Sequence, residues 1–179
     1  MMKKIVLILF VVGFSVSLSY GQSAEISQTG QKTTYAAGDD GDLERGIAWP
    51  SPRFTDHGDG TITDELTGLM WSKNANLGSM TWQGALDYVE TLSIGGYSDW
   101  RLPNRKELFS LIDHSKNAPA LPVDHLFQNV QSDYYWSSTT SASSTAHAWV
   151  VGMWNGNVYD GSKSYKSYYY YVWPVRSGQ

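Results

Sequence analysis

The stretch from Gly95 to Asp113 constrains the fold most, because a glycine turn there leads directly into the start of a helix. Asn104 is placed to act as the N-cap, and the Glu107 side chain can bond back to its amide to complete a capping box. Pro103 fixes the direction in which the chain reaches the cap. The sequence therefore predicts a helix from Arg105 to about Asp113, with an apolar face of Leu108, Leu111 and Ile112.

Two arginines stand beside tryptophans in apolar surroundings. A guanidinium in such a place is either a buried group bonded to carboxylates and backbone, or a binding group for an anion. The structural role is favoured, because the five donors of arginine can join segments that are distant in sequence. We expect the pair 100–101 to meet the segment 173–176 near the C-terminus. The residues assigned a structural role are Trp100, Arg101, Asn104, Glu107, Trp173 and Arg176.

The remaining pattern predicts an α+β fold in which two short helices pack on a mostly antiparallel sheet with long irregular loops. The first helix begins after its N-cap, Thr81, runs to Leu92 and ends at the glycine pair 95–96. Before it, a turn at Asp59-Gly60 predicts a hairpin over 54–71. Further strands are predicted from β-branched and aromatic residues over 134–140, 146–153, 157–159 and 168–176.

The N-terminus has the pattern of a signal peptide, with Lys3 and Lys4, an apolar run from Ile5 to Val16, and cleavage after Gly21. The apolar run is too short to span a bilayer, so no membrane span is expected after cleavage. We expect a secreted or periplasmic protein. Its organisation is a signal peptide over 1–21, a flexible polar lead-in over 22–52 and one domain over 53–179.

The composition limits how this domain is stabilised and what it binds. The chain has no cysteine but has eight tryptophans and twelve tyrosines. We therefore expect an aromatic core to provide the stability that disulfides provide in many exported proteins. Its formal net charge is −4, and cleavage of the leader removes two lysines and makes the chain more acidic. This charge argues against nucleic acid as a partner.

Familiar catalytic and metal-binding motifs are absent from the sequence. There is no Gly-x-Ser-x-Gly elbow and no HExxH pair, although His114 and His125 could meet across a proline-containing loop. Asp56, Asp59 and Asp64 are close enough to suggest a calcium ion, but their register before the glycine is wrong for a calcium loop, and a plain turn is favoured. We assign no catalytic residue, metal or cofactor. A carboxylate pair for polysaccharide hydrolysis has no fixed spacing and stays open.

A stretch rich in serine, threonine, asparagine, glycine and tyrosine runs from Ser137 to Tyr171. Aromatic faces beside short hydroxyl and amide side chains suit sugars or other proteins, because they offer stacking area and hydrogen bonds. The alternative is a simple alternation of the tyrosines between core and solvent. A hairpin turn at Asn155-Gly156 is expected to expose its neighbours. The expected ligand-binding residues are Trp154, Asn155, Asn157 and Tyr159.

Several separated motifs resemble the bacterial Lcl C-terminal domain family, a domain of unknown function. They are RFTDHGDGTITDELTGLMW at 53–71, TW at 81–82, GGYSDWRLPNRKEL at 95–108, YWSST at 135–139 and VWPVR at 172–176. The resemblance covers about residues 53–178 and implies a C-type-lectin-like fold, with two helices on a mixed, mostly antiparallel sheet.

The resemblance implies less about function. The best-known member of the family ends a collagen-like adhesin that binds sulfated polysaccharides and forms trimers, whereas this chain is acidic and has no Gly-x-y repeat. It also lacks the sugar motifs of calcium-dependent lectins and the active-site cysteines of formylglycine-generating enzymes, whose fold is similar.

The sequence therefore predicts an exported, non-enzymatic recognition or adhesion module that binds glycan or a surface protein. One alternative is a hydrolase of cell-envelope polysaccharide. The other is a structural subunit of a surface assembly, in which case the chain forms an oligomer.

Overall fold

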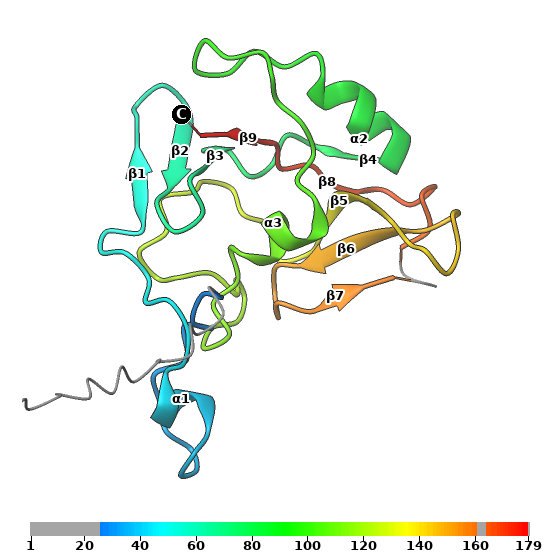
Figure 1. Ribbon diagram of the computed structural model, residues 1–179. Coiled ribbons are helices and arrows are strands. Elements are labelled where there is room, and N and C mark those ends of the chain that lie inside the picture. The colour runs from blue at the N-terminus through cyan, green and yellow to red at the C-terminus, as the bar shows by residue number, and fades with distance from the viewer. Residues whose placement is uncertain (1–25, 161–163, 179) are drawn as a thin grey trace, which may run out of the picture.

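The computed structural model describes residues 26–160 and 164–178, which form two β-sheets and three helices (Figure 1). One sheet has the strand order β1-β2-β3-β9 and the other the order β4-β8-β5-β6-β7. Neighbouring strands are antiparallel except for β5 and β8, which are parallel. The α+β class predicted from the sequence is confirmed. The strands are β1 (Phe54–Asp56), β2 (Thr61–Asp64), β3 (Leu69–Ser72), β4 (Ser79–Met80), β5 (Tyr134–Thr140), β6 (Ala148–Gly152), β7 (Val158–Tyr159), β8 (Tyr170–Tyr171) and β9 (Val175–Ser177).

Two sheets take the place of the single predicted sheet because the last predicted strand is interrupted. Residues 168–176 divide into β8, which pairs with β4 and β5, and β9, which pairs with β3. Pro174 lies at the break, and proline has no amide hydrogen to continue a strand ladder. The segment therefore leaves one sheet and joins the other.

The first hairpin forms as predicted. β1 pairs with β2 in the register Phe54↔Asp64, and the connection passes through Asp59 and Gly60. The Asp59 carboxylate accepts hydrogen bonds from the Thr61 amide at 3.0 Å and the Thr61 hydroxyl at 2.6 Å. An aspartate that bonds to the backbone two residues later stabilises a turn locally, so the turn is set by its own sequence.

Helix α2 (Trp82–Val89) starts where the sequence predicts and ends earlier. The Thr81 hydroxyl accepts from the Gly84 amide at 3.3 Å, which makes Thr81 the N-cap. The prediction that glycines end this helix is wrong, because its last residue is Val89 and Gly95 and Gly96 form a separate turn. In that turn the amides of Ile94 and Tyr97 donate to each other's carbonyls at 3.1 and 3.0 Å.

Helix α3 (Arg105–Phe109) has the predicted capping box. The Asn104 side chain accepts from the amides of Lys106 and Glu107, and Glu107 Oε2 accepts from the Asn104 amide at 2.7 Å. The helix is shorter than the predicted 105–113. After Phe109 the bonds change to the tighter i−3 pattern, because the amides of residues 111 and 112 donate to the carbonyls of residues 108 and 109.

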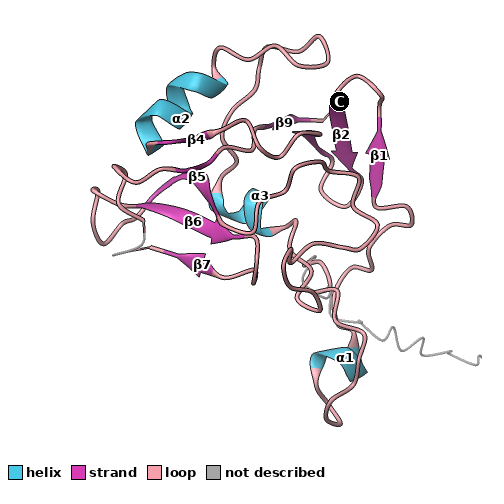
Figure 2. Cartoon of the chain, turned by 180° about the vertical axis from the view of Figure 1, so that it is seen from behind, coloured by secondary structure: helices cyan, strands magenta, loops and turns pink. Residues whose placement is uncertain are grey.

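The two main helices lie on opposite faces of the five-stranded sheet. On β5, Tyr135 packs in the cluster that contains Leu108 of α3, and the next residue, Trp136, packs in the cluster that contains Ala85 and Val89 of α2. Successive side chains of a strand point to opposite faces. Figure 2 shows α2 and α3 apart on the two sides of β5. The expected aromatic core is present, with Trp71, Trp136, Trp173 and Tyr135 fully buried.

The arginines 101 and 176 lie next to each other, where the stretch that follows Gly95 meets β9. Arg101 and Val175 exchange backbone hydrogen bonds at 3.0 and 2.9 Å. The Arg101 guanidinium makes two bonds with the Glu107 carboxylate at 2.7 and 2.8 Å, and Arg176 makes two with Asp99 at 2.6 and 3.1 Å. Both side chains thus join segments of the fold.

Part of the predicted lead-in has a defined arrangement. A bridge joins Ser27 to Ile47, and the short helix α1 (Asp40–Leu43) lies in the loop between them. This loop projects from the rest of the chain in Figure 1. The Trp49 indole donates to the Gln28 carbonyl at 2.9 Å, and the His114 amide donates to the Thr29 carbonyl at 2.9 Å. The lead-in therefore contacts the domain that follows through Thr29.

The predicted signal peptide lies outside the described residues. Within 26–160 and 164–178, no helix combines the length and the apolar character that are needed to cross a bilayer.

Candidate functional site

Of the four residues predicted to bind a ligand, Trp154, Asn155 and Asn157 lie on the connection from β6 to β7, and Tyr159 lies in β7 itself. The Gly152 amide donates to the Asn157 carbonyl at 2.9 Å, and the Gly156 amide donates to the Gly152 carbonyl at 2.8 Å. Gly156 has φ +72°, and a Cβ there would lie 2.6 Å from an Ile112 methyl. Only glycine fits this position. The turn is therefore tied to the body of the domain and holds its side chains in place.

Two aromatic rings from this turn and from β7 share a perpendicular neighbour from β5. The rings of Trp154 and Tyr159 are nearly parallel, with an interplanar angle of 17° and centroids 6.5 Å apart. The Tyr134 ring packs edge-to-face with both, at 4.6 and 5.3 Å. Tyr170 of β8 contacts Tyr134 at 5.0 Å. We call Trp154, Tyr159, Tyr134 and Tyr170 the aromatic face.

Tyr134 and Tyr170 belong to this face but were not among the ligand-binding residues predicted from the sequence. Tyr134 opens the predicted strand and alternates with buried Tyr135, and Tyr170 alternates with Tyr171, which packs on the opposite side. The alternation of side chains between the two sides of each strand was the sequence signal that could have identified them. The pairing of β5 with β8, which places Tyr134 beside Tyr170, depends on tertiary contacts between segments far apart in sequence.

Amide groups lie next to the rings. Asn155 and Asn157 are both exposed. The Asn157 side-chain amide donates to the Tyr159 hydroxyl at 3.0 Å, and Asn155 Oδ1 accepts from the backbone N–H of Asn157 at 3.0 Å. These bonds fix the orientation of both asparagine side chains beside Trp154. Two exposed side-chain amides with defined hydrogen bonds therefore lie beside the aromatic face.

The Tyr170 phenol is neutral at ordinary pH. Burial, together with the neighbouring Tyr134 and the charge of Asp133, raises the pKa of Tyr170 to about 12. Burial likewise raises the pKa of Tyr135, which packs on the opposite side of the sheet. The Asp133 side chain is exposed and accepts from the Tyr134 amide at 2.7 Å. The nearby formal charge that acts on these rings is thus negative.

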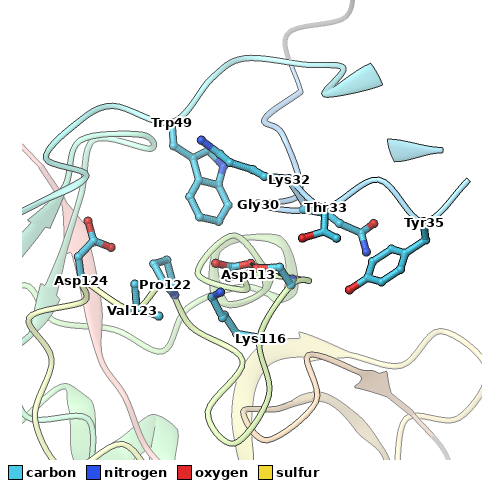
Figure 3. A pocket seen from close by; sticks show the side chains of 12 residues that line it. Gly30, Lys32, Thr33, Tyr35, Trp49, Asp113, Lys116, Pro122, Val123 and Asp124 are labelled. Atoms are coloured by element: carbon cyan, nitrogen blue, oxygen red, sulfur yellow. Dashed lines mark hydrogen bonds between the residues drawn. The ribbon is translucent and has the colours of Figure 1, made fainter. Parts of the chain in front are cut away.

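A separate cavity of about 460 Å³ lies between the N-terminal segment and the loop after α3. Figure 3 shows Trp49 and Lys32 from the N-terminal segment across from Asp113 and Lys116 of the loop. Asp113 is buried, and its Oδ1 accepts from the Ser115 amide at 2.8 Å and the Ser115 hydroxyl at 2.6 Å. The walls carry both signs of charge.

A smaller groove of about 240 Å³ lies between α3 and the strands β6 and β7. Its lining includes Trp149, Phe109 and Val158, and the Arg105 guanidinium lies 4.3 Å from the centre of the Trp149 ring. Arginine thus covers part of the tryptophan, and less of that ring is open to a ligand.

The three aspartates that suggested calcium have other partners. Asp56 pairs with Lys73, Asp59 bonds to Thr61, and Asp64 is fully buried against Arg53. The two histidines of the loop also pack separately, His114 against Phe109 and His125 against Phe127. In the part of the chain that the structure describes, no group of three or more His, Cys, Asp or Glu side chains is arranged to hold a metal ion.

Comparison with known families bears on the same region. A family model described as the Lcl C-terminal domain matches residues 60–176, which is more than half of the chain and confirms the resemblance seen in the sequence. The match includes β2, both main helices, the β6–β7 turn and the aromatic face. No curated protein matches the chain.

Proposed function

The chain belongs to the Lcl C-terminal domain family, and from this premise we propose that it is an exported, non-enzymatic recognition module that binds glycan through its aromatic face. We also propose that its fold is C-type-lectin-like, as the resemblance implies. The two helices on opposite faces of a largely antiparallel sheet, and the long irregular segment between α3 and β5, support this assignment.

The observation that carries the proposal is the placement of Trp154 and Tyr159, nearly parallel and braced by Tyr134. A pyranose ring has an apolar face of C–H groups and a rim of hydroxyls. Aromatic rings provide large, rigid contact area at low entropic cost, and amides such as those of Asn155 and Asn157 provide hydrogen bonds. Bracing by Tyr134 and the bonded turn lowers the ordering cost of binding.

The cavity beside Asp113 and the groove beside Trp149 are less suited to a neutral sugar. In the cavity beside Asp113, acidic and basic groups face one another across the opening. In the smaller groove, Arg105 lies over Trp149. A neutral sugar ring therefore finds its stacking surface at Trp154 rather than at either hollow.

The experiment is a glycan array probed with the chain after Gly21 and with two variants. Trp154→Ala removes the largest ring of the aromatic face. Tyr169→Ala is the matched control, because Tyr169 is 68% exposed and has no ring contact among the described residues. We expect the wild type and Tyr169→Ala to bind the same glycans and Trp154→Ala to lose them.

Circular dichroism and thermal unfolding of all three proteins verify that each is folded. The absence of any glycan bound by the wild type would refute the proposal. So would a folded Trp154→Ala protein that binds every glycan as the wild type does.

A further inference from the structure

The aromatic face continues into a longer series of rings. Tyr168 contacts Tyr170 with centroids 6.2 Å apart, and Tyr165 contacts Tyr168 at 5.6 Å. Tyr134 contacts both Tyr170, at 5.0 Å, and Trp154, at 4.6 Å, so these rings form one continuous series of contacts. We call Trp154, Tyr134, Tyr170, Tyr168 and Tyr165 the aromatic row.

The row is extended, because its two ends lie at opposite ends of β6. Tyr165 pairs with His147 just before the strand starts, and its ring lies 4.1 Å from the imidazole. Trp154 follows just after the strand ends. Five residues of β-strand, Ala148–Gly152, span about 17 Å. The ends of the row are therefore separated by several times the width of one pyranose ring.

Both ends of the row are accessible. Tyr165 and Tyr168 are 41% and 42% exposed, and Trp154 is part-exposed. The middle, Tyr134 and Tyr170, is half-buried and packed against Trp136 and other residues of the sheet. Exposed aromatic rings at two separated points on a rigid base are suited to contacting two separated units of one ligand.

The net charge of the chain favours a neutral ligand over a polyanion. Charges of both signs lie near the row: Asp133, just before β5, acts electrostatically on Tyr170, and the Lys166 ammonium lies 3.8 Å from the centre of the Trp82 ring. The chain as a whole is acidic, with a formal net charge of −4. A polyanion would therefore be repelled at long range.

We propose, on the basis of the glycan-binding function above, that the site takes a linear, neutral, β-linked oligosaccharide that lies along the aromatic row and contacts it at several successive sugar units. A β-linked glucose chain fits this description, because its equatorial hydroxyls leave flat C–H faces along the whole chain. The row then provides separate contacts for the units nearest Trp154 and for those nearest Tyr168 and Tyr165.

The test is a calorimetric titration of cello-oligosaccharides, from cellobiose to cellohexaose. We expect cellohexaose to bind about tenfold more tightly than cellobiose, since the longer chain adds further aromatic contacts. Tyr168→Ala and Tyr165→Ala should each weaken cellohexaose about three- to tenfold and leave cellobiose unchanged. Tyr169→Ala is the control and should leave both unchanged.

Four results would overturn the inference: no binding of cellohexaose, equal affinity for the two ligands, wild-type binding of cellohexaose by both tyrosine variants, or equally tight binding of oligogalacturonate. Unfolding curves show whether each variant is folded. These failures differ from a failure of the proposed function, which is shown by the absence of any bound glycan on the array or by a folded Trp154→Ala protein that binds every glycan as the wild type does. A protein that binds another array glycan but not cellohexaose keeps the function and loses the inference.

Discussion

Asp64→Asn is expected to lower the free energy of unfolding by about 3–5 kcal/mol, because it leaves the charge of Arg53 buried without a counter-charge. The two side chains are only 2% and 0% exposed. Arg53 Nε and Nη2 donate to the two oxygens of Asp64 at 2.9 and 3.0 Å, and Nη2 also donates to the Ser110 carbonyl at 2.6 Å. The pair therefore ties the first hairpin to the end of α3.

The surroundings of Arg53 explain why the aspartate is needed. The guanidinium carbon lies 4.4 Å from the centre of the Trp49 ring and 4.9 Å from that of Phe54. Its Nη1 has no hydrogen-bond partner among the described residues. Asparagine at position 64 has nearly the same volume, so no cavity forms. It lacks the negative charge, however, and its amide hydrogens would face the donors of Arg53.

The assay is urea unfolding, with a thermal melt as a second measurement. A loss of 3–5 kcal/mol corresponds to a fall in melting temperature of about 10 °C for a domain of this size. The double variant Arg53→Met/Asp64→Leu removes both charges and should be more stable than Asp64→Asn alone. The reasoning is refuted if Asp64→Asn costs less than about 1 kcal/mol, or if the double variant is the less stable of the two.

Three further perturbations follow from the same structure. Arg101→Ala should lower the free energy of unfolding by only about 1 kcal/mol, because the ion pair that it removes, with Glu107, is partly exposed. The variant should leave glycan affinity unchanged. A loss of affinity at unchanged stability would contradict the structural role of Arg101. Burial raises the pKa of Glu107, but hydrogen bonds from Arg101 and the Asn104 amide lower it by more, so the net pKa is lowered. The stability that Glu107 contributes is therefore complete above its ordinary pKa of 4.5 and is lost as the pH falls below 4.5. Glu107→Gln should flatten the acid side of the curve of stability against pH, and an unchanged curve would contradict this. Gly95→Ala should destabilise the fold by at least about 1 kcal/mol more than Gly96→Ala in the same urea assay. The backbone φ is positive at both positions, but only at Gly95 would a Cβ lie 2.5 Å from a threonine methyl of β2. Equal losses of stability in the two variants would contradict this.

Local signals in the sequence were sufficient for several elements. The capping box at Asn104, the N-cap at Thr81 and the turn at Asp59-Gly60 each depend on bonds within a few residues, and all three are present. The strand over 134–140 was predicted with the bounds that β5 has. Interactions of this range can be inferred from spacing alone.

Features that depend on distant contacts were harder to predict. The division of 168–176 between two sheets depends on the pairing of β8 with β4 and of β9 with β3. The buried Arg53–Asp64 pair was missed, because neither residue has a motif that marks it as buried. The turn with Trp154 was predicted, but the other half of the aromatic face comes from β5 and β8, and only the fold brings these strands beside it.

The central claim is that glycan binds at Trp154. It is tested most directly by following the indole N–H signals of the eight tryptophans in ¹H–¹⁵N NMR spectra during titration with the best glycan from the array. Each candidate region contains one part-exposed tryptophan: Trp154 on the aromatic face, Trp49 at the cavity and Trp149 in the groove. Single Trp→Phe variants assign the three signals. We predict that the glycan shifts the Trp154 signal and leaves those of Trp49 and Trp149 in place; a shift of either of these two with Trp154 unmoved would contradict the claim.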